Sequence, residues 1–141
     1  MDTLATLASA MRKSSRSPDE TRTFPNGKVE MFHLHDRDVA LVRLQPGWKF
    51  STDVGPIQNT TKCQTGHLQY VISGRLMVEM EDGTRLELGA GDFASIPPGH
   101  DAWVLGDEPF VAVDFLDMKE YAQPQEEPHF APFFDEIVGF D

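Results

Sequence analysis

The segment TKCQTGHLQYVISGRL, residues 61–76, combines a β-strand pattern with two residue types that bind metals. Its second half, HLQYVIS followed by Gly74, is rich in β-branched and aromatic residues and is typical of a strand that runs into a tight turn. Its first half contains the single cysteine of the chain, Cys63, four residues before His67. The segment therefore indicates a β fold, and Cys63 and His67 are either metal ligands or ordinary core residues.

Length and charge limit the classes of protein that this chain can represent. With 141 residues and 40% hydrophobic composition, the chain is long enough for one domain with a real core. Its net charge of −11, without a cluster of Lys and Arg, predicts that neither nucleic acid nor an anionic membrane is a partner. One cysteine cannot form an intramolecular disulfide, and the N-terminal segment has its basic residues after the apolar part, so we expect a cytoplasmic protein.

Turn signals at short intervals from residue 21 onward predict an all-β sandwich or barrel. The clearest hairpin is RLMVEMEDGTRLEL, residues 75–88, in which Asp82-Gly83 is expected to form a type I′ turn with positive φ angles. Alternation along the two strands predicts a buried face made of Leu76, Val78, Met80, Leu86 and Leu88.

The chain divides into three parts on this pattern. Residues 1–20 form an N-terminal tail or short helix, residues 21–117 form the barrel, and residues 118–141 form a C-terminal arm. The arm contains an aromatic cluster, Phe130, Phe133, Phe134 and Phe140. Because a solvated tail rarely carries so many aromatic residues, we expect the arm to pack on the barrel or on a partner subunit, and the chain to form a homodimer.

The block from Gly47 to Gly99 resembles the cupin family of small β-barrels. Residues 91–99, GDFASIPPG, match the glycine and proline spacing of the second cupin motif, and HLQYVISG matches the end of the first. The resemblance covers roughly residues 17–115 and is nearest to small single-domain bacterial cupins. It implies a cupin β-barrel, also called a double-stranded β-helix or jelly roll.

The resemblance also implies a metal site, but with unusual ligands. When HLQYVISG is aligned with the end of the first cupin motif, His67 stands where the family usually has Glu, and Cys63 stands at a position usually held by His. Counting back from His67 puts the first family histidine on Thr61, whereas counting forward from Gly47 puts it on Asp53.

The histidine of the second motif would fall on Ala102, but this chain has His100 two residues earlier. His100 has the same strand parity as Ala102 and should also point into the barrel. The resemblance and the parity together predict a site made of Cys63, His67 and His100, with Asp53 as a fourth ligand.

A thiolate with two imidazoles favours a divalent transition metal, with zinc preferred over iron, nickel or copper. Parity along the presumed inner face predicts that Gln69 and Lys49 contact a substrate. Four aromatic residues have the opposite parity and are expected to pack on the outer face or at an interface: Trp48, Phe50, Tyr70 and Trp103.

These observations predict a metal-binding cupin that binds a small molecule in the barrel pocket. As an enzyme it would be of the isomerase, lyase, hydrolase or dioxygenase type; the alternative is a non-catalytic, metal-free cupin that binds or senses a ligand. The three other histidines are expected to be unrelated to the site. The pair His33 and His35 should lie on a solvent-facing edge, and His129 should lie in the arm.

Overall fold

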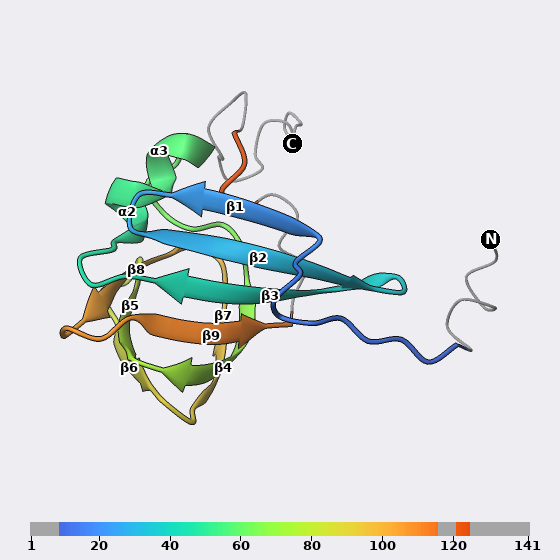
Figure 1. Cartoon of the computed structure of the whole chain (residues 1–141). Helices are drawn as coiled ribbons and strands as arrows, with labels where there is room; N and C mark the ends of the chain where they lie inside the picture. Colours follow the sequence, from blue (N-terminus) through green and yellow to red (C-terminus); the bar gives the residue numbers. More distant parts are fainter. Residues whose placement is uncertain (1–8, 116–120, 125–141) are drawn as a thin grey trace.

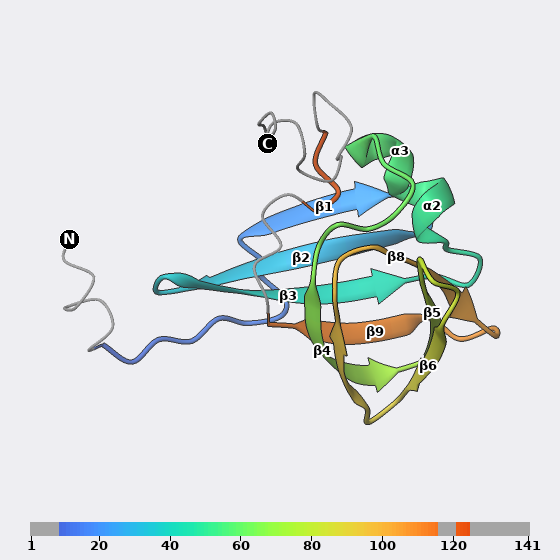
Figure 2. The same cartoon turned by 180° about the vertical axis from the view of Figure 1, so that it is seen from behind.

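The computed structural model describes residues 9–115 and 121–124, which form two antiparallel sheets. The larger sheet has the order β1 (Glu20–Phe24), β2 (Gly27–Leu34), β3 (Arg37–Leu44), β9 (Phe110–Asp114), β4 (His67–Ser73) and β7 (Phe93–Ile96). The smaller sheet has the order β6 (Arg85–Gly89), β5 (Arg75–Met80) and β8 (His100–Leu105). Both sheets curve round a common interior (Figures 1 and 2), which confirms the all-β barrel prediction.

Strand alternation determines which residues face the interior. In β9, Phe110, Ala112 and Asp114 are buried while Val111 and Val113 between them are half-buried. The inward side chains of the other strands complete one apolar core, which includes Val29, Met31, Val42, Val71 and Val78. Asp114 is therefore a carboxylate placed by strand parity on the otherwise apolar inner face of β9.

The hairpin of β5 and β6 forms as predicted, but its turn and one of its side chains differ. Gly83 has a φ of +88°, whereas Asp82 has no positive φ, so the turn is not type I′. The amide of Gly83 donates to the carbonyl of Met80, and the carboxylate of Asp82 accepts from the amide of Thr84, which together stabilise a longer loop. Leu86, predicted to be buried, is 52% exposed, whereas Leu88 on the same edge strand is buried and only 3% exposed.

The segment after Gly47 is helical where an extended strand was expected. Two short helices, α2 (Phe50–Asp53) and α3 (Gly55–Gln58), follow Trp48 and lie at one end of the barrel (Figure 1). The alternation of side chains between the two faces of a strand therefore does not apply to this segment. The prediction that Trp48 and Phe50 face outward is wrong, because both are buried in the core. Tyr70 and Trp103 are half-buried, and Tyr70 stacks on the exposed Phe93.

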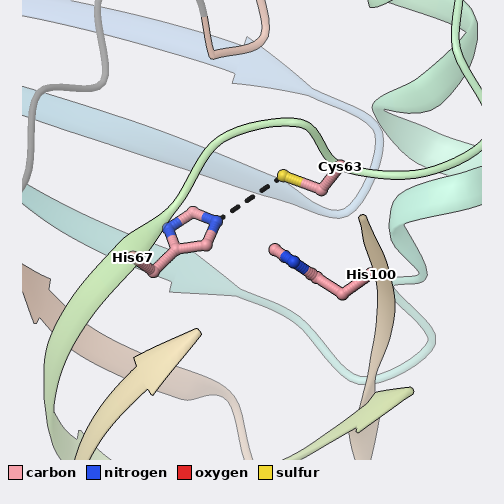
Figure 3. A group of neighbouring side chains, drawn as sticks. All are labelled: Cys63, His67 and His100. Carbon is pink, nitrogen blue, oxygen red and sulfur yellow. Dashed lines mark hydrogen bonds between the residues drawn. The ribbon is translucent and has the colours of Figure 1, made fainter. Parts of the chain in front are cut away.

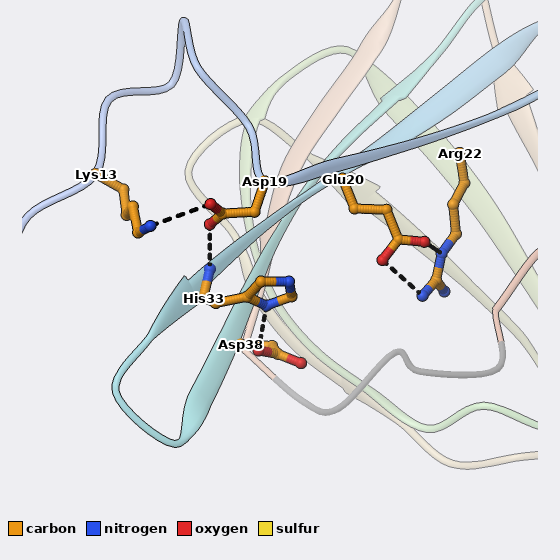
Figure 4. A network of polar contacts seen from close by, with 6 residues as sticks. All are labelled: Lys13, Asp19, Glu20, Arg22, His33 and Asp38. Atoms are coloured by element: carbon orange, nitrogen blue, oxygen red, sulfur yellow. Dashed lines mark hydrogen bonds and ion pairs between the residues drawn. The ribbon is translucent and has the colours of Figure 1, made fainter. Parts of the chain in front are cut away.

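A chain of polar contacts connects residues 13–19 to the edge of the larger sheet (Figure 4). The carboxylate of Asp19 accepts from the amide of His33 at 2.8 Å and pairs with Lys13 at 3.1 Å. The side chain of His33 is exposed, as expected, and contacts Asp38 at 2.7 Å. His35, also expected to face solvent, is half-buried. Residues 9–19 contain no helix, and residues 1–8 lie outside the described part.

The C-terminal arm is described only at residues 121–124, where Tyr121 and Ala122 are buried. The four phenylalanines of the arm and His129 lie outside the described residues. Within the described part of the chain, no helix has the length and apolar character needed to cross a membrane.

Candidate metal centre

Cys63, His67 and His100 meet between the two sheets, at one end of the barrel (Figure 3). His67 is the first residue of β4 in the larger sheet, and His100 is the first residue of β8 in the smaller one. Cys63 lies in the loop before β4, where its amide donates to the carbonyl of His100 at 2.7 Å and its carbonyl accepts from the amide of Gly99 at 2.7 Å. This backbone pairing, rather than a continuous strand through Cys63 and His67, brings the thiol to the histidines.

The three side chains have a spacing that suits a metal ion. One ligand atom from each residue lies within 4.8 Å of the others, and all three residues are buried. The Sγ of Cys63 lies 3.6 Å from Nε2 of His67. Tetrahedral zinc, with Zn–S of about 2.3 Å and Zn–N of about 2.05 Å, would separate these two atoms by roughly 3.6 Å. The donor set and this distance therefore fit zinc without rearrangement of that pair.

Hydrogen bonds orient both imidazoles with Nε2 toward the site. The Nδ1 of His67 contacts Oδ2 of Asp114 at 2.6 Å, and the Nδ1 of His100 contacts the carbonyl oxygen of Pro97 at 2.8 Å. Because each acceptor requires a proton on Nδ1, the Nε2 lone pairs are available for coordination when the rings are neutral. Such partners of the distal nitrogen are the usual support of metal-ligating histidines.

The electrostatics of the site stabilise a thiolate beside an imidazolium. Burial alone would raise the pKa of the Cys63 thiol, but hydrogen bonds from His100 and His67 and their charges outweigh it and lower the pKa to about 6. Burial would likewise lower the pKa of His67, but the hydrogen bonds to Asp114 and Cys63 and their negative charges raise it to about 9. The cysteine is therefore prepared as a ligand at neutral pH, and His67 must lose a proton to become one.

A small cavity of about 30 Å³ adjoins the three side chains. Its walls are mainly apolar and include Val42, Leu44, Val78, Ile96, Ala102 and Phe110. Tyr121 also lines the cavity, with its ring 6.0 Å from the ring of His67 and its backbone oxygen held by Arg22 at 2.9 Å. Burial and the nearby charges of Cys63 and Asp114 raise the pKa of the Tyr121 phenol well above its usual value, so the phenol stays protonated.

The structure does not bring Asp53 or Thr61 to the other predicted ligands. Asp53 lies at the end of α2, where its Oδ2 accepts from the amide of Lys49 at 3.0 Å and from the side chain of Asn26 at 3.4 Å. Thr61 is exposed in the loop before Cys63. Asp53 was expected at a family histidine position by counting forward from Gly47, but the segment around it is helical, and its carboxylate instead accepts from the amide of Lys49 at the start of α2.

The two predicted substrate contacts have different positions. Gln69 is buried, lines the cavity, and donates from Nε2 to Oδ2 of Asp114 at 3.2 Å. Lys49 is exposed, does not line the cavity, and places its ammonium 5.1 Å from the ring centre of Trp103. The helical turn after Lys49 again explains why this side chain does not reach the interior.

Two residues of the site were not expected from the sequence. Asp114 could have been found, because it has the parity of Phe110 and Ala112 in a strand-like run. Tyr121 carries no such signal: it follows the last strand and is buried beside the rings of Phe24, Phe50 and His67.

The chain belongs to the cupin domain family, which its sequence matches over residues 40–116. Solved structures agree with this fold. A protein of unknown function (DUF1255) from Acinetobacter sp. ADP1 is 16% identical over 70% of this chain and 90% of its own, with a TM-score of 0.52. A DUF1255 protein of unknown function from Acidithiobacillus ferrooxidans is 20% identical over 70% of this chain and 88% of its own, also with a TM-score of 0.52.

An oxalate decarboxylase from Lactobacillus farciminis, solved as a formate complex, is 21% identical over 75% of this chain, with a TM-score of 0.52. This chain covers only 31% of that enzyme. At these identities the likeness concerns the fold alone. A search of curated proteins finds no match to the sequence.

Proposed function

We propose that this protein is a metal-binding cupin that holds a divalent transition metal at Cys63, His67 and His100 and binds a small molecule in the adjoining cavity. The observation that supports this most directly is the convergence of three buried ligand atoms within 4.8 Å of one another inside the barrel. Zinc suits the mixed sulfur and nitrogen donors best, and iron, nickel or copper could use the same imidazoles.

Three protein ligands would leave one position of a tetrahedral metal open, which is the arrangement of catalytic rather than structural zinc sites. When bound there, such a metal supplies Lewis acidity toward a carbonyl or carboxylate oxygen and lowers the pKa of a bound water. Isomerase, lyase and hydrolase chemistry would follow from these properties, and dioxygenase chemistry would be an option if the metal were iron.

The residues around the three ligands have distinct tasks in this proposal. Asp114 fixes the ring of His67 and makes its Nε2 more basic toward a cation. Gln69 donates from its amide nitrogen to the same oxygen, Oδ2, of that carboxylate. Tyr121 lines the cavity beside His67 and restricts access to the site.

The metal content of protein purified without a histidine tag tests the proposal. We expect close to one equivalent of zinc or another transition metal in the wild type and strong loss of the metal in Cys63→Ser. As a control, Ser95→Ala changes an exposed residue of β7 and should keep the full metal content. Metal-free wild type that also resists reconstitution would refute the metal site and support the metal-free ligand-binding cupin.

A further inference from the structure

The cavity contains two buried polar atoms without partners, in addition to the three proposed metal ligands. The indole nitrogen Nε1 of Trp48 and the amide oxygen Oε1 of Gln69 are both buried and have no hydrogen-bond partner among the described residues. Both side chains line the same cavity. An unpaired buried polar group destabilises the folded state, so a partner for each of the two atoms is expected in the functional state.

One of the two unpaired atoms is a hydrogen-bond donor and the other is an acceptor. The indole N–H of Trp48 can only donate a hydrogen bond. The orientation of the Gln69 amide follows from its neighbour: Asp114 carries a carboxylate, which accepts, so the amide nitrogen must face it and the oxygen must face away. The cavity therefore offers one donor and one acceptor to whatever occupies it.

The remaining walls exclude strongly charged ligands. None of the described residues that line the cavity is a lysine or an arginine. A thiolate, a divalent cation and the Asp114 carboxylate beside His67 sum to no net charge, so every carboxylate of a ligand adds negative charge to the site, and a monoanion is favoured over a dianion. Apolar side chains such as Val78, Ile96 and Ala102 would pack against a short aliphatic part of the ligand.

We propose that the cavity recognises short-chain hydroxy-carbonyl compounds, with 2-hydroxy monocarboxylic acids as the preferred class. A carbonyl or carboxylate oxygen would accept from Trp48, and the ligand hydroxyl would donate to Oε1 of Gln69. This inference rests on the proposed function, since the metal provides the positive charge that the walls lack. The cavity of about 30 Å³ holds about one water molecule, so Tyr121 must withdraw to admit even a two-carbon acid.

The test uses zinc-loaded protein, the hydroxy acids glycolate and lactate, and acetate and propionate, which lack the hydroxyl; oxalate serves as a dianion. Indole N–H signals in ¹⁵N NMR spectra report binding, because the chain has two tryptophans and Trp103→Phe identifies the signal of Trp48. We expect the hydroxy acids to shift the Trp48 signal and to bind about tenfold more tightly than the acids without hydroxyl, or about 1.4 kcal/mol. Oxalate should bind more weakly than glycolate.

Two variants separate the roles of the two atoms. Gln69→Met removes the acceptor at similar volume and should bring the affinities of lactate and propionate within about threefold of each other, which is less than 1 kcal/mol. Trp48→Phe should weaken both acids by a similar factor and keep their ratio. Trp103→Phe, which changes a residue outside the cavity, should leave both affinities unchanged.

Three results would overturn the inference: equal affinities for the hydroxy acids and for the acids without the hydroxyl, an unmoved Trp48 signal at saturation, or no binding of any acid. The last result would mean that a water molecule satisfies the two atoms. The metal content of each sample is measured in parallel. Full zinc occupancy without acid binding rejects the ligand class and leaves the metal site standing, whereas lack of zinc rejects the metal site itself.

Discussion

The Nδ1 of His67 lies 2.6 Å from Oδ2 of Asp114, and this contact joins the neighbouring strands β4 and β9 on the inner face of the larger sheet. Asp114 is directly opposite Gln69 in the strand pairing, so its carboxylate lies between two inward side chains of β4. The fold thus supplies the carboxylate that orients the histidine, from a strand that contributes no ligand.

Asp114→Asn should weaken zinc binding roughly 10- to 100-fold, because the amide supports the His67 ring less strongly than the carboxylate does. A competition titration with a coloured chelator measures the change. Asp53→Asn is the matched control, since Asp53 is also a buried aspartate and lies outside the group of ligand atoms. Equal losses in the two variants would contradict the assignment and would return Asp53 to the site.

Metal binding should release about one proton at a pH of about 7.5. Between the pKa of Cys63 at about 6 and that of His67 at about 9, the metal-free site holds a thiolate and an imidazolium. Coordination requires the neutral imidazole of His67, so His67 loses its proton on binding, and affinity should rise with pH until about 9. Below about 6, Cys63 must lose a proton as well.

Calorimetry in buffers of different ionisation enthalpy counts the released protons. Asp114→Asn should lower the pKa of His67, because the hydrogen bond to Asp114 raises it, and should release fewer protons at the same pH. Metal binding without proton release in the wild type would show that His67 does not coordinate the ion.

Tyr121→Ala should speed the removal of zinc by a soluble chelator about tenfold, because loss of the ring opens the cavity beside His67. Tyr121→Phe is the matched control: it keeps the ring that closes the cavity and loses only the hydroxyl. Stopped-flow measurement of metal transfer gives the rates. If both variants release zinc at the wild-type rate, Tyr121 does not cover the site.

Gly74→Ala should destabilise the fold more than Gly83→Ala. Both glycines have positive φ angles, of 81° and 88°, and alanine costs about 1–2 kcal/mol in that conformation. A Cβ at Gly74 would also collide with the backbone of Pro109 and Phe110, whereas a Cβ at Gly83 meets nothing within 4 Å.

We therefore expect a further loss of about 1–3 kcal/mol for Gly74→Ala, the usual cost of overpacking. Urea denaturation of the two variants and the wild type gives the free energies of unfolding. Equal losses would contradict the close approach between the start of β5 and the start of β9.

The sequence predicted the barrel well because its strands are short, its turn residues are strong, and one face of each strand is apolar. The convergence of Cys63, His67 and His100 followed from the cupin register together with strand parity. That reasoning failed between Lys49 and Gln58, where two helical turns replace the expected strand. A four-residue helix has too few residues to show a helical period, so its effect on Asp53, Lys49, Trp48 and Phe50 could not be predicted.

The remaining parts of the site depend on contacts that are distant in sequence. Asp114 lies 47 residues from His67, and Tyr121 follows the last strand of the barrel. Local patterns can place Asp114 on a face but cannot say which strand will be its neighbour. That Nε1 of Trp48 and Oε1 of Gln69 find no partner among the described residues is likewise a property of packing.

X-ray absorption at the zinc edge measures the coordination of the metal directly. For the wild type we predict one sulfur at about 2.3 Å and two or three nitrogen or oxygen neighbours at about 2.0–2.1 Å, and for Cys63→Ser no sulfur. A wild-type spectrum with only oxygen and nitrogen neighbours, or one unchanged by Cys63→Ser, would show that the metal does not lie between Cys63, His67 and His100.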